Sequence, residues 1–192
     1  MRRLHGVFLA LMLMSQCGCR DTASPAGSQP DSVEPAAGES AATLAARALD
    51  TSLPQAQRRD AATRMMTAAE PDAAIPSMHS LLATSDDDSV REMMAKRLGD
   101  LRDMDSSPQL IEAMGDSSTR VREAAAHSLI KMLGRDYFFR PDDPPDLQRA
   151  AQDRYRRYWD YIQGNPYMLE TFRERNQQLR REWEAALRPE QE

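Results

Sequence analysis

Apolar residues recur at helical spacing in the middle of the chain, and the same arrangement occurs twice. One set is Val90, Met94, Leu98 and Leu101, and the other is Val121, Ala125, Leu129 and Met132. Intervals of three or four residues place side chains on one face of an α-helix. Each segment is therefore predicted to form a helix that buries one face and leaves the opposite face in water.

A shorter apolar segment and an acidic turn precede each of these helices. The shorter segments are residues 75–82 and 108–114, and the turns are residues 85–88 and 115–118. Helix, acidic turn and helix thus form a unit that recurs after 31 residues, the separation of Val90 and Val121. A fainter first copy covers residues 44–49 and 58–65, where Arg58 and Met65 occupy the places of Arg91 and Leu98.

Such a unit cannot bury its apolar face alone, so its stability depends on neighbouring units stacked against it. Abundant Ala, Met, Leu, Arg, Glu and Gln also favour helices, because unbranched side chains lose little rotamer freedom there. The sequence predicts an all-α fold, a short α-solenoid of about three helix pairs over residues 41–134. Ala95 and the alanines of 124–126 are expected to let adjacent helices approach closely.

The acidic turn, the Val-Arg-Glu of residues 90–92 and 121–123, and a small-residue helix ending in Leu resemble the HEAT-repeat family in its bacterial variety. The resemblance covers about residues 41–134 and is weakest in the first unit, where Gln57 stands in the place of Val. It implies an α-solenoid with a binding role and gives no catalytic residues to carry over.

After Gly134 the chain becomes rich in aromatic residues and proline, and helical spacing resumes near Asp146 and again after Pro166. A solenoid leaves an open apolar side after its last unit. We therefore expect residues 135–192 to form a loop and two capping helices. The side chains expected to fill the open side are Tyr155, Trp159, Phe172 and Trp183.

Residues 1–19 have the organisation of a signal peptide, with two arginines, a short apolar run and a cleavage region ending in Cys19. The apolar run is far shorter than the ~20 residues that span a bilayer. Gly18-Cys19 resembles the lipobox of bacterial lipoproteins, in which the cysteine becomes the lipidated N-terminus. Gln16 replaces the usual Leu, which leaves Cys17 as the alternative. An ordinary cleaved signal peptide is the competing interpretation.

The signal predicts export to the bacterial cell envelope, with the protein held by lipid at the periplasmic face or the cell surface. Residues 20–40 are poor in apolar side chains and are expected to be a disordered tether. Its root-mean-square span would be about 25 Å. The folded part contains no cysteine, which excludes a disulfide within it.

The net charge of −5 argues against a nucleic-acid partner, because it gives no attraction to phosphates. The turn Asp86–Asp88 lacks the alternating ligands of a calcium loop, and helix capping is the favoured role. His79 and His127 have no second His or Cys at ligand spacing. His127 matches Lys96 in register, so we expect it to be exposed.

Arg91 and Arg122 occupy equivalent positions and are the candidate interaction residues. They either form a positive ridge for an anionic ligand or pair with acidic turns of their own or the neighbouring unit, and the second interpretation is favoured. The sequence predicts a non-catalytic protein-interaction scaffold or adaptor without cofactor or metal. The alternative is an enzyme or ligand-binding protein that uses the concave face of the solenoid as a pocket.

Overall fold

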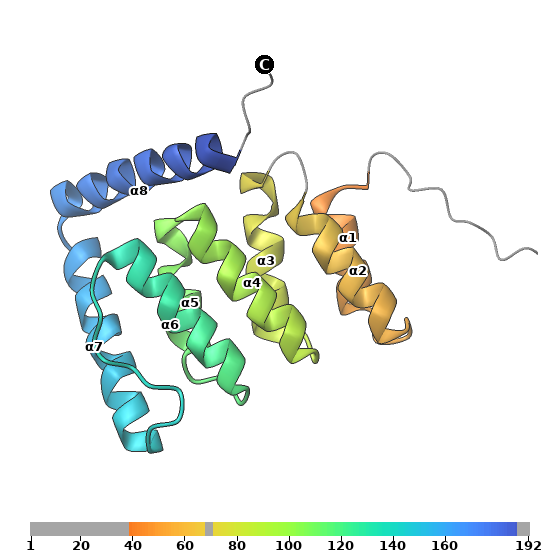
Figure 1. Ribbon diagram of the computed structural model, residues 1–192, viewed down its shortest axis with the longest axis horizontal. Helices are drawn as coiled ribbons and strands as arrows, with labels where there is room; N and C mark the ends of the chain where they lie inside the picture. Colours follow the sequence, from red (N-terminus) through yellow and green to blue (C-terminus); the bar gives the residue numbers. More distant parts are fainter. Residues whose placement is uncertain (1–38, 68–70, 188–192) are drawn as a thin grey trace, which may run out of the picture. The chain divides into compact units, whose positions relative to one another are not determined.

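A computed structural model describes residues 39–67 and 71–187 of the chain, and over these residues it is helical and contains no strand (Figure 1). The all-α prediction is confirmed. Cys17, Cys19, the signal peptide and residues 20–38 of the tether lie outside the described residues. The α-helices are α1 (Ala41–Leu49), α2 (Gln55–Met66), α3 (Ile75–Thr84), α4 (Asp88–Leu101), α5 (Ser107–Ala113), α6 (Thr119–Leu133), α7 (Pro145–Gln163) and α8 (Pro166–Leu187).

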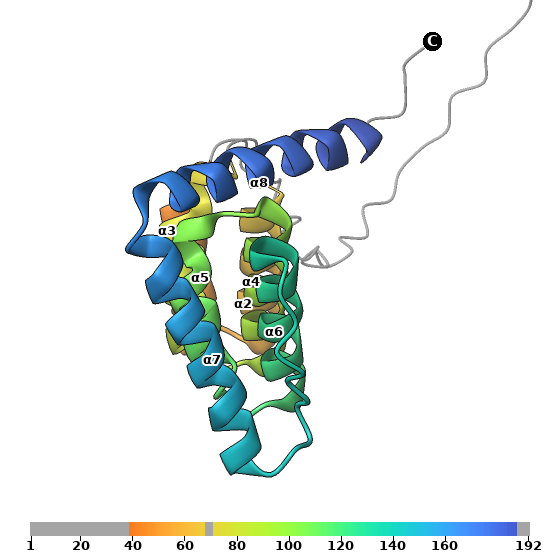
Figure 2. The same ribbon diagram turned by 90° about the vertical axis from the view of Figure 1, so that its left-hand side faces the viewer.

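The first six helices form three consecutive pairs, α1 with α2, α3 with α4, and α5 with α6. The first members lie side by side in one row and the second members in another, as Figure 2 shows for α3 and α5 on one side and α2, α4 and α6 on the other. We call α1, α3 and α5 the first-helix row, and α2, α4 and α6 the second-helix row. This is the arrangement of a short α-solenoid.

The repeated apolar positions form the core between the two rows. Val90, Leu98, Val121 and Leu129 are fully buried, and so is Met65, the residue aligned with Leu98 in the first unit. The register proposed from the sequence therefore matches the observed burial in all three units.

Close contact between α4 and α6 depends on small residues. Gly99 lies against Ser128 so closely that a Cβ atom at position 99 would collide with the Ser128 side chain. The Ser128 hydroxyl donates to the Ala95 carbonyl at 2.8 Å, which satisfies this buried group across the helix interface. Ala95 and Ala125 are buried at the same interface, as expected for small residues that allow helices to approach.

α7 covers the side of the third unit but does not continue the repeat. The loop from Gly134 to Pro144 runs back along α6, so α7 begins at the end of the molecule where α6 begins (Figure 1). The Gln152 side chain donates to the Ile111 carbonyl at 2.7 Å, and Trp159, about two turns further on, lies beside Pro108. α7 is therefore antiparallel to α5, whereas α3 and α5 run in the same direction.

α8 crosses the solenoid instead of covering its open side. It passes over the turns that join the units, the 3-10 helices η1 (Asp72–Ala74) and η2 (Met104–Ser106) (Figure 1). Asn176 is its buried residue and donates to the Met132 carbonyl at 3.0 Å. Arg173 contacts Asp105 at 2.8 Å and Arg180 contacts Asp72 at 2.5 Å.

The path of α8 shows that one expectation about the cap was wrong: Trp183 does not fill the open side of the third unit. Tyr155 and Trp159 are buried against the third unit and Phe172 is partly buried, but Trp183 is 40% exposed. Trp183 lies near the end of α8, beyond the part that docks through Asn176. α7 thus supplies the apolar cover, while α8 is held largely by polar contacts.

The fold begins slightly before the predicted end of the tether. The Ser40 hydroxyl caps α1 by accepting from the Thr43 amide at 3.1 Å, as N-cap serines do. Glu39 accepts from Arg47 and Arg64 of the first unit. Among the helices of the described residues, none has the length and apolar character needed to cross a membrane.

Candidate partner-binding groove

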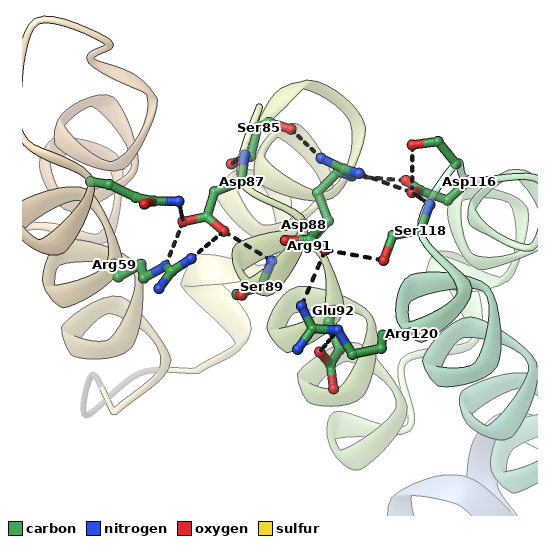
Figure 3. Close-up of polar contacts among 12 residues, drawn as sticks. Arg59, Ser85, Asp87, Asp88, Ser89, Arg91, Glu92, Asp116, Ser118 and Arg120 are labelled. Carbon is green, nitrogen blue, oxygen red and sulfur yellow. Dashed lines mark hydrogen bonds and ion pairs between the residues drawn. The ribbon is translucent and has the colours of Figure 1, made fainter.

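Arg91 belongs to a ladder of ion pairs that joins one unit to the next (Figure 3). Its guanidinium donates two hydrogen bonds to the Asp116 carboxylate, at 2.8 and 2.9 Å, and a third to the Ser85 carbonyl. Asp116 lies in the acidic turn of the following unit. The side chains of Arg91 and Asp116 are only 12% and 13% exposed, so the pair is not free to receive an anionic ligand.

Arg122 repeats half of this arrangement. Arg91 donates to the carbonyl six residues before it, and Arg122 does the same to the Asp116 carbonyl at 2.9 Å. Where Arg91 reaches a carboxylate of the next unit, Arg122 reaches the Pro141 carbonyl at 2.6 Å. Arg122 therefore fastens the loop after α6 to the third unit, and the described residues include no ion pair for it.

The acidic turn of the second unit meets the first unit in the same way. Asp87 accepts from Arg59 at 2.5 and 3.0 Å and also caps α4 by accepting from the Ser89 amide at 3.0 Å. The Arg59 hydrogen bond outweighs burial and lowers the pKa of Asp87 to about 2. Asp86 pairs with Arg58. The capping role expected for this turn is observed at Asp87.

Capping differs in the third unit. Ser118 stands at the start of α6, but its side chain does not cap the helix. Asp116 accepts from the Ser118 amide at 2.7 Å instead. Burial alone would raise the pKa of Asp116, but Arg91 and this amide outweigh burial and the pKa is lowered.

The exposed charges of the second-helix row also pair across units. Lys131 contacts Asp100 at 2.8 Å, and Arg120 contacts Asp88 at 3.1 Å and Glu92 at 3.7 Å. Lys96 pairs with Glu92 within α4. A protein that binds this surface would compete with these pairs. His127 is exposed on α6, as its register predicts.

The first-helix row is hollowed instead. α5 has seven residues and lies between α3, with ten, and α7, with nineteen, so the surface is recessed on both sides of α5. Between α3 and α5 lies a hollow of about 420 Å³. Its lining is largely apolar and includes His79, Leu82, Ala83, Pro108, Glu112 and Ala113.

A second hollow of about 260 Å³ lies between α5 and α7. It shares Pro108 and Glu112 with the first hollow, and Arg156 and Trp159 line its other wall. Arg156 contacts Glu112 at 2.7 Å across the ridge of α5. The two hollows with Pro108 and Glu112 between them define one surface, which we call the α5 groove.

His79 lies at the wall of the first hollow and is held in place by a hydrogen-bonded chain. Its Nε2 atom lies 2.7 Å from the Ser106 hydroxyl, which donates to Asp103 at 2.7 Å. Burial lowers the pKa of His79, and the nearby Asp103 opposes the shift. Burial therefore favours the neutral imidazole. The Ser106 hydroxyl belongs to a fully buried residue and is not available as a nucleophile.

Nothing in the sequence pattern marks Glu112 or Pro108 as functional residues. Residues 108–114 show only the spacing of an apolar segment, and the groove depends on two features that this segment alone does not encode. One feature is the short length of α5, which the sequence does indicate, because Gly115 follows just after the helix ends. The other is the reversed docking of α7, which is a non-local property.

Helix pairs stacked in two rows define a class, the α-solenoid repeat proteins. A model of HEAT repeats matches residues 41–130 and, in a second overlapping match, residues 75–159. The chain belongs to the HEAT-repeat family, and the second match includes α7 up to Trp159. Comparisons with curated proteins and with solved structures give no match.

Family membership defines a helical repeat scaffold of the kind that mediates protein interactions. Among residues 39–67 and 71–187, no group of three His, Cys, Asp or Glu residues is arranged to hold a metal ion.

Proposed function

We propose that the protein is a non-catalytic interaction scaffold that binds a segment of a partner protein in the α5 groove. The observation that carries this proposal is the contrast between the two rows of a HEAT-repeat solenoid. The second-helix row pairs its charges across units, whereas the first-helix row offers an apolar recess that protein side chains could fill. A catalytic role for the groove has less support than a binding role. His79 is its histidine, and the Nε2 atom of His79 is already engaged in a hydrogen bond with the buried Ser106 hydroxyl.

Site-specific photo-crosslinking tests this assignment. A photoreactive residue at Ala83, in the groove, should give an adduct with one cellular protein, and the same residue at His127, on the second-helix row, should give none. The adduct is identified by mass spectrometry, and the purified partner is then titrated against the protein to obtain a Kd. An adduct at His127 with none at Ala83 would show that the partner binds the second-helix row and not the α5 groove.

We also propose that the scaffold is exported and tethered to the cell envelope by lipid at Cys19, with Cys17 as the alternative. The support is the sequence of residues 1–19: a basic start, a short apolar run and Gly18-Cys19. A single acyl chain binds membranes only weakly, so more than one chain would be needed for stable attachment. The partner would then be a protein of the same compartment.

Replacing Cys17 and Cys19 together by Ser should move the protein from the membrane fraction to the soluble fraction, because no thiol would remain to carry lipid. Cell fractionation measures the distribution, and mass spectrometry of the purified native protein detects the adduct. Single replacements assign the site, since only the lipidated cysteine should be required. Unchanged membrane association of the double variant, with no adduct on the native protein, would end the proposal.

A further inference from the structure

The hollow between α3 and α5 has a chemistry that specifies more than a general apolar partner. We propose that it receives a lysine or arginine side chain of the partner protein, with the aliphatic stem on the floor of the hollow and the cationic head at Glu112. This inference rests on the proposed function and adds the chemical class of the group that is bound.

The floor suits an aliphatic stem. Leu82 and Ala83 of α3 face Pro108 of α5 across the hollow, and α3 contains no Asp, Glu, Lys or Arg. Lysine and arginine bury their methylene stems on apolar surfaces while the charged head stays at the rim. A cavity of about 420 Å³ is large enough for one such side chain.

The charge at the rim is negative and available. Glu112 and Asp116 are the charged residues among those that line the hollow. Asp116 is taken by two hydrogen bonds from Arg91 and is only 13% exposed. Glu112 is 71% exposed, and its ion pair with Arg156 is an exposed contact of a kind that contributes little to stability. A partner cation can therefore approach Glu112 without breaking a buried pair.

The other polar side chains that line the hollow, His79 and Gln109, do not oppose a cation. Gln109 is neutral, and burial lowers the pKa of His79, which favours the uncharged imidazole. Arg156 lines the second hollow, on the α7 side of Glu112, and is not among the residues that line the first. The first hollow thus combines an apolar floor with a carboxylate whose ion pair, to Arg156, is exposed to solvent.

Three labelled synthetic peptides test the contributions of the methylene stem and of the positive charge separately. They share one sequence and differ at a single position, which holds lysine, norleucine or diaminopropionate. Norleucine keeps a stem without the ammonium group, and diaminopropionate keeps an ammonium group on a short stem. In fluorescence anisotropy titrations at pH 7, the lysine peptide should bind more tightly than both others by about fivefold or more, equivalent to about 1 kcal/mol.

Matched charge reversals locate the interaction. Glu112→Lys should weaken binding of the lysine peptide by about tenfold, because attraction is replaced by repulsion. Glu123→Lys on α6 makes the same change in net charge at an exposed residue of the second-helix row, and should leave the Kd within about twofold. Thermal melting of both variants checks that the fold is retained.

Equal weakening by the two reversals would show that only net charge matters and would overturn the inference. Equal binding of the lysine and norleucine peptides, or no binding of the lysine peptide, would overturn it as well. These failures are separable from failure of the proposed function. If a partner is crosslinked at Ala83 and its affinity is unchanged by Glu112→Lys, the scaffold function stands, and the proposal that the hollow binds a cationic side chain is wrong.

Discussion

Replacing Leu98 or Leu129 by alanine should lower the free energy of unfolding by about 2–5 kcal/mol, the usual range for truncating a buried leucine. Both side chains are fully buried, and they occupy equivalent positions in the second and third units. α4 and α6 contact each other closely through Gly99 and Ser128, so the surrounding helices have little freedom to close a cavity. Urea or thermal denaturation followed by circular dichroism measures the loss.

His127→Ala is the control for these two substitutions, because His127 is exposed on the same helix as Leu129. A surface change of this kind should alter stability by less than about 0.5 kcal/mol. If His127→Ala proved more destabilising than either leucine substitution, the assignment of buried and exposed faces to α4 and α6 would be wrong.

The three helix pairs could be predicted because each depends on information that repeats within the chain. Apolar spacing alone predicts a helix, but the recurrence of Val90 and Leu98 as Val121 and Leu129 also sets the register of one unit on the next. The acidic turns were predictable for the same reason. Asp116 lies within reach of Arg91 because stacking brings each turn beside the preceding second helix.

The path of the last two helices could not be predicted, since it follows from contacts without a repeated counterpart. α8 has apolar residues at helical spacing, and this led to the expectation that Trp183 fills the open side of the third unit. The buried anchor of α8 is instead the polar residue Asn176, whose amide satisfies the Met132 carbonyl at the end of α6. An apolar pattern gives no sign of a helix whose buried anchor is an amide and whose other docking contacts include ion pairs.

The α5 groove could not be predicted from the sequence for a related reason. Glu112 lies on a short helix between two longer ones, and its role depends on which helices come to lie on each side. The Glu112 contact with Arg156 joins residues 44 positions apart, between α5 and the reversed α7. Local pattern predicts each helix, but the recess exists only after the helices are packed.

Deleting residues 146–192 should leave the remaining repeats unfolded or aggregated. The deletion removes Tyr155, Trp159 and Ile162, which are buried against the third unit at 5% exposure or less. Burying a large apolar side chain contributes about 1.5–3 kcal/mol, and whole domains are stable by only about 5–15 kcal/mol. Losing three such side chains, and exposing the apolar surface of α5 that they cover, removes a large fraction of that margin.

Size-exclusion chromatography with light scattering and thermal melting of the 41–134 fragment, compared with the intact folded part, measure the outcome. A second truncation that removes only residues 166–192 is the matched control, because it deletes α8 and keeps α7. We expect this variant to fold with a lower Tm, since α8 is fastened by Asn176 and ion pairs more than by buried apolar side chains. If the 41–134 fragment is instead monomeric and melts cooperatively at the temperature of the intact protein, α7 and α8 are independent of the repeats. Their aromatic faces would then replace the α5 groove as the leading candidate for the partner-binding surface.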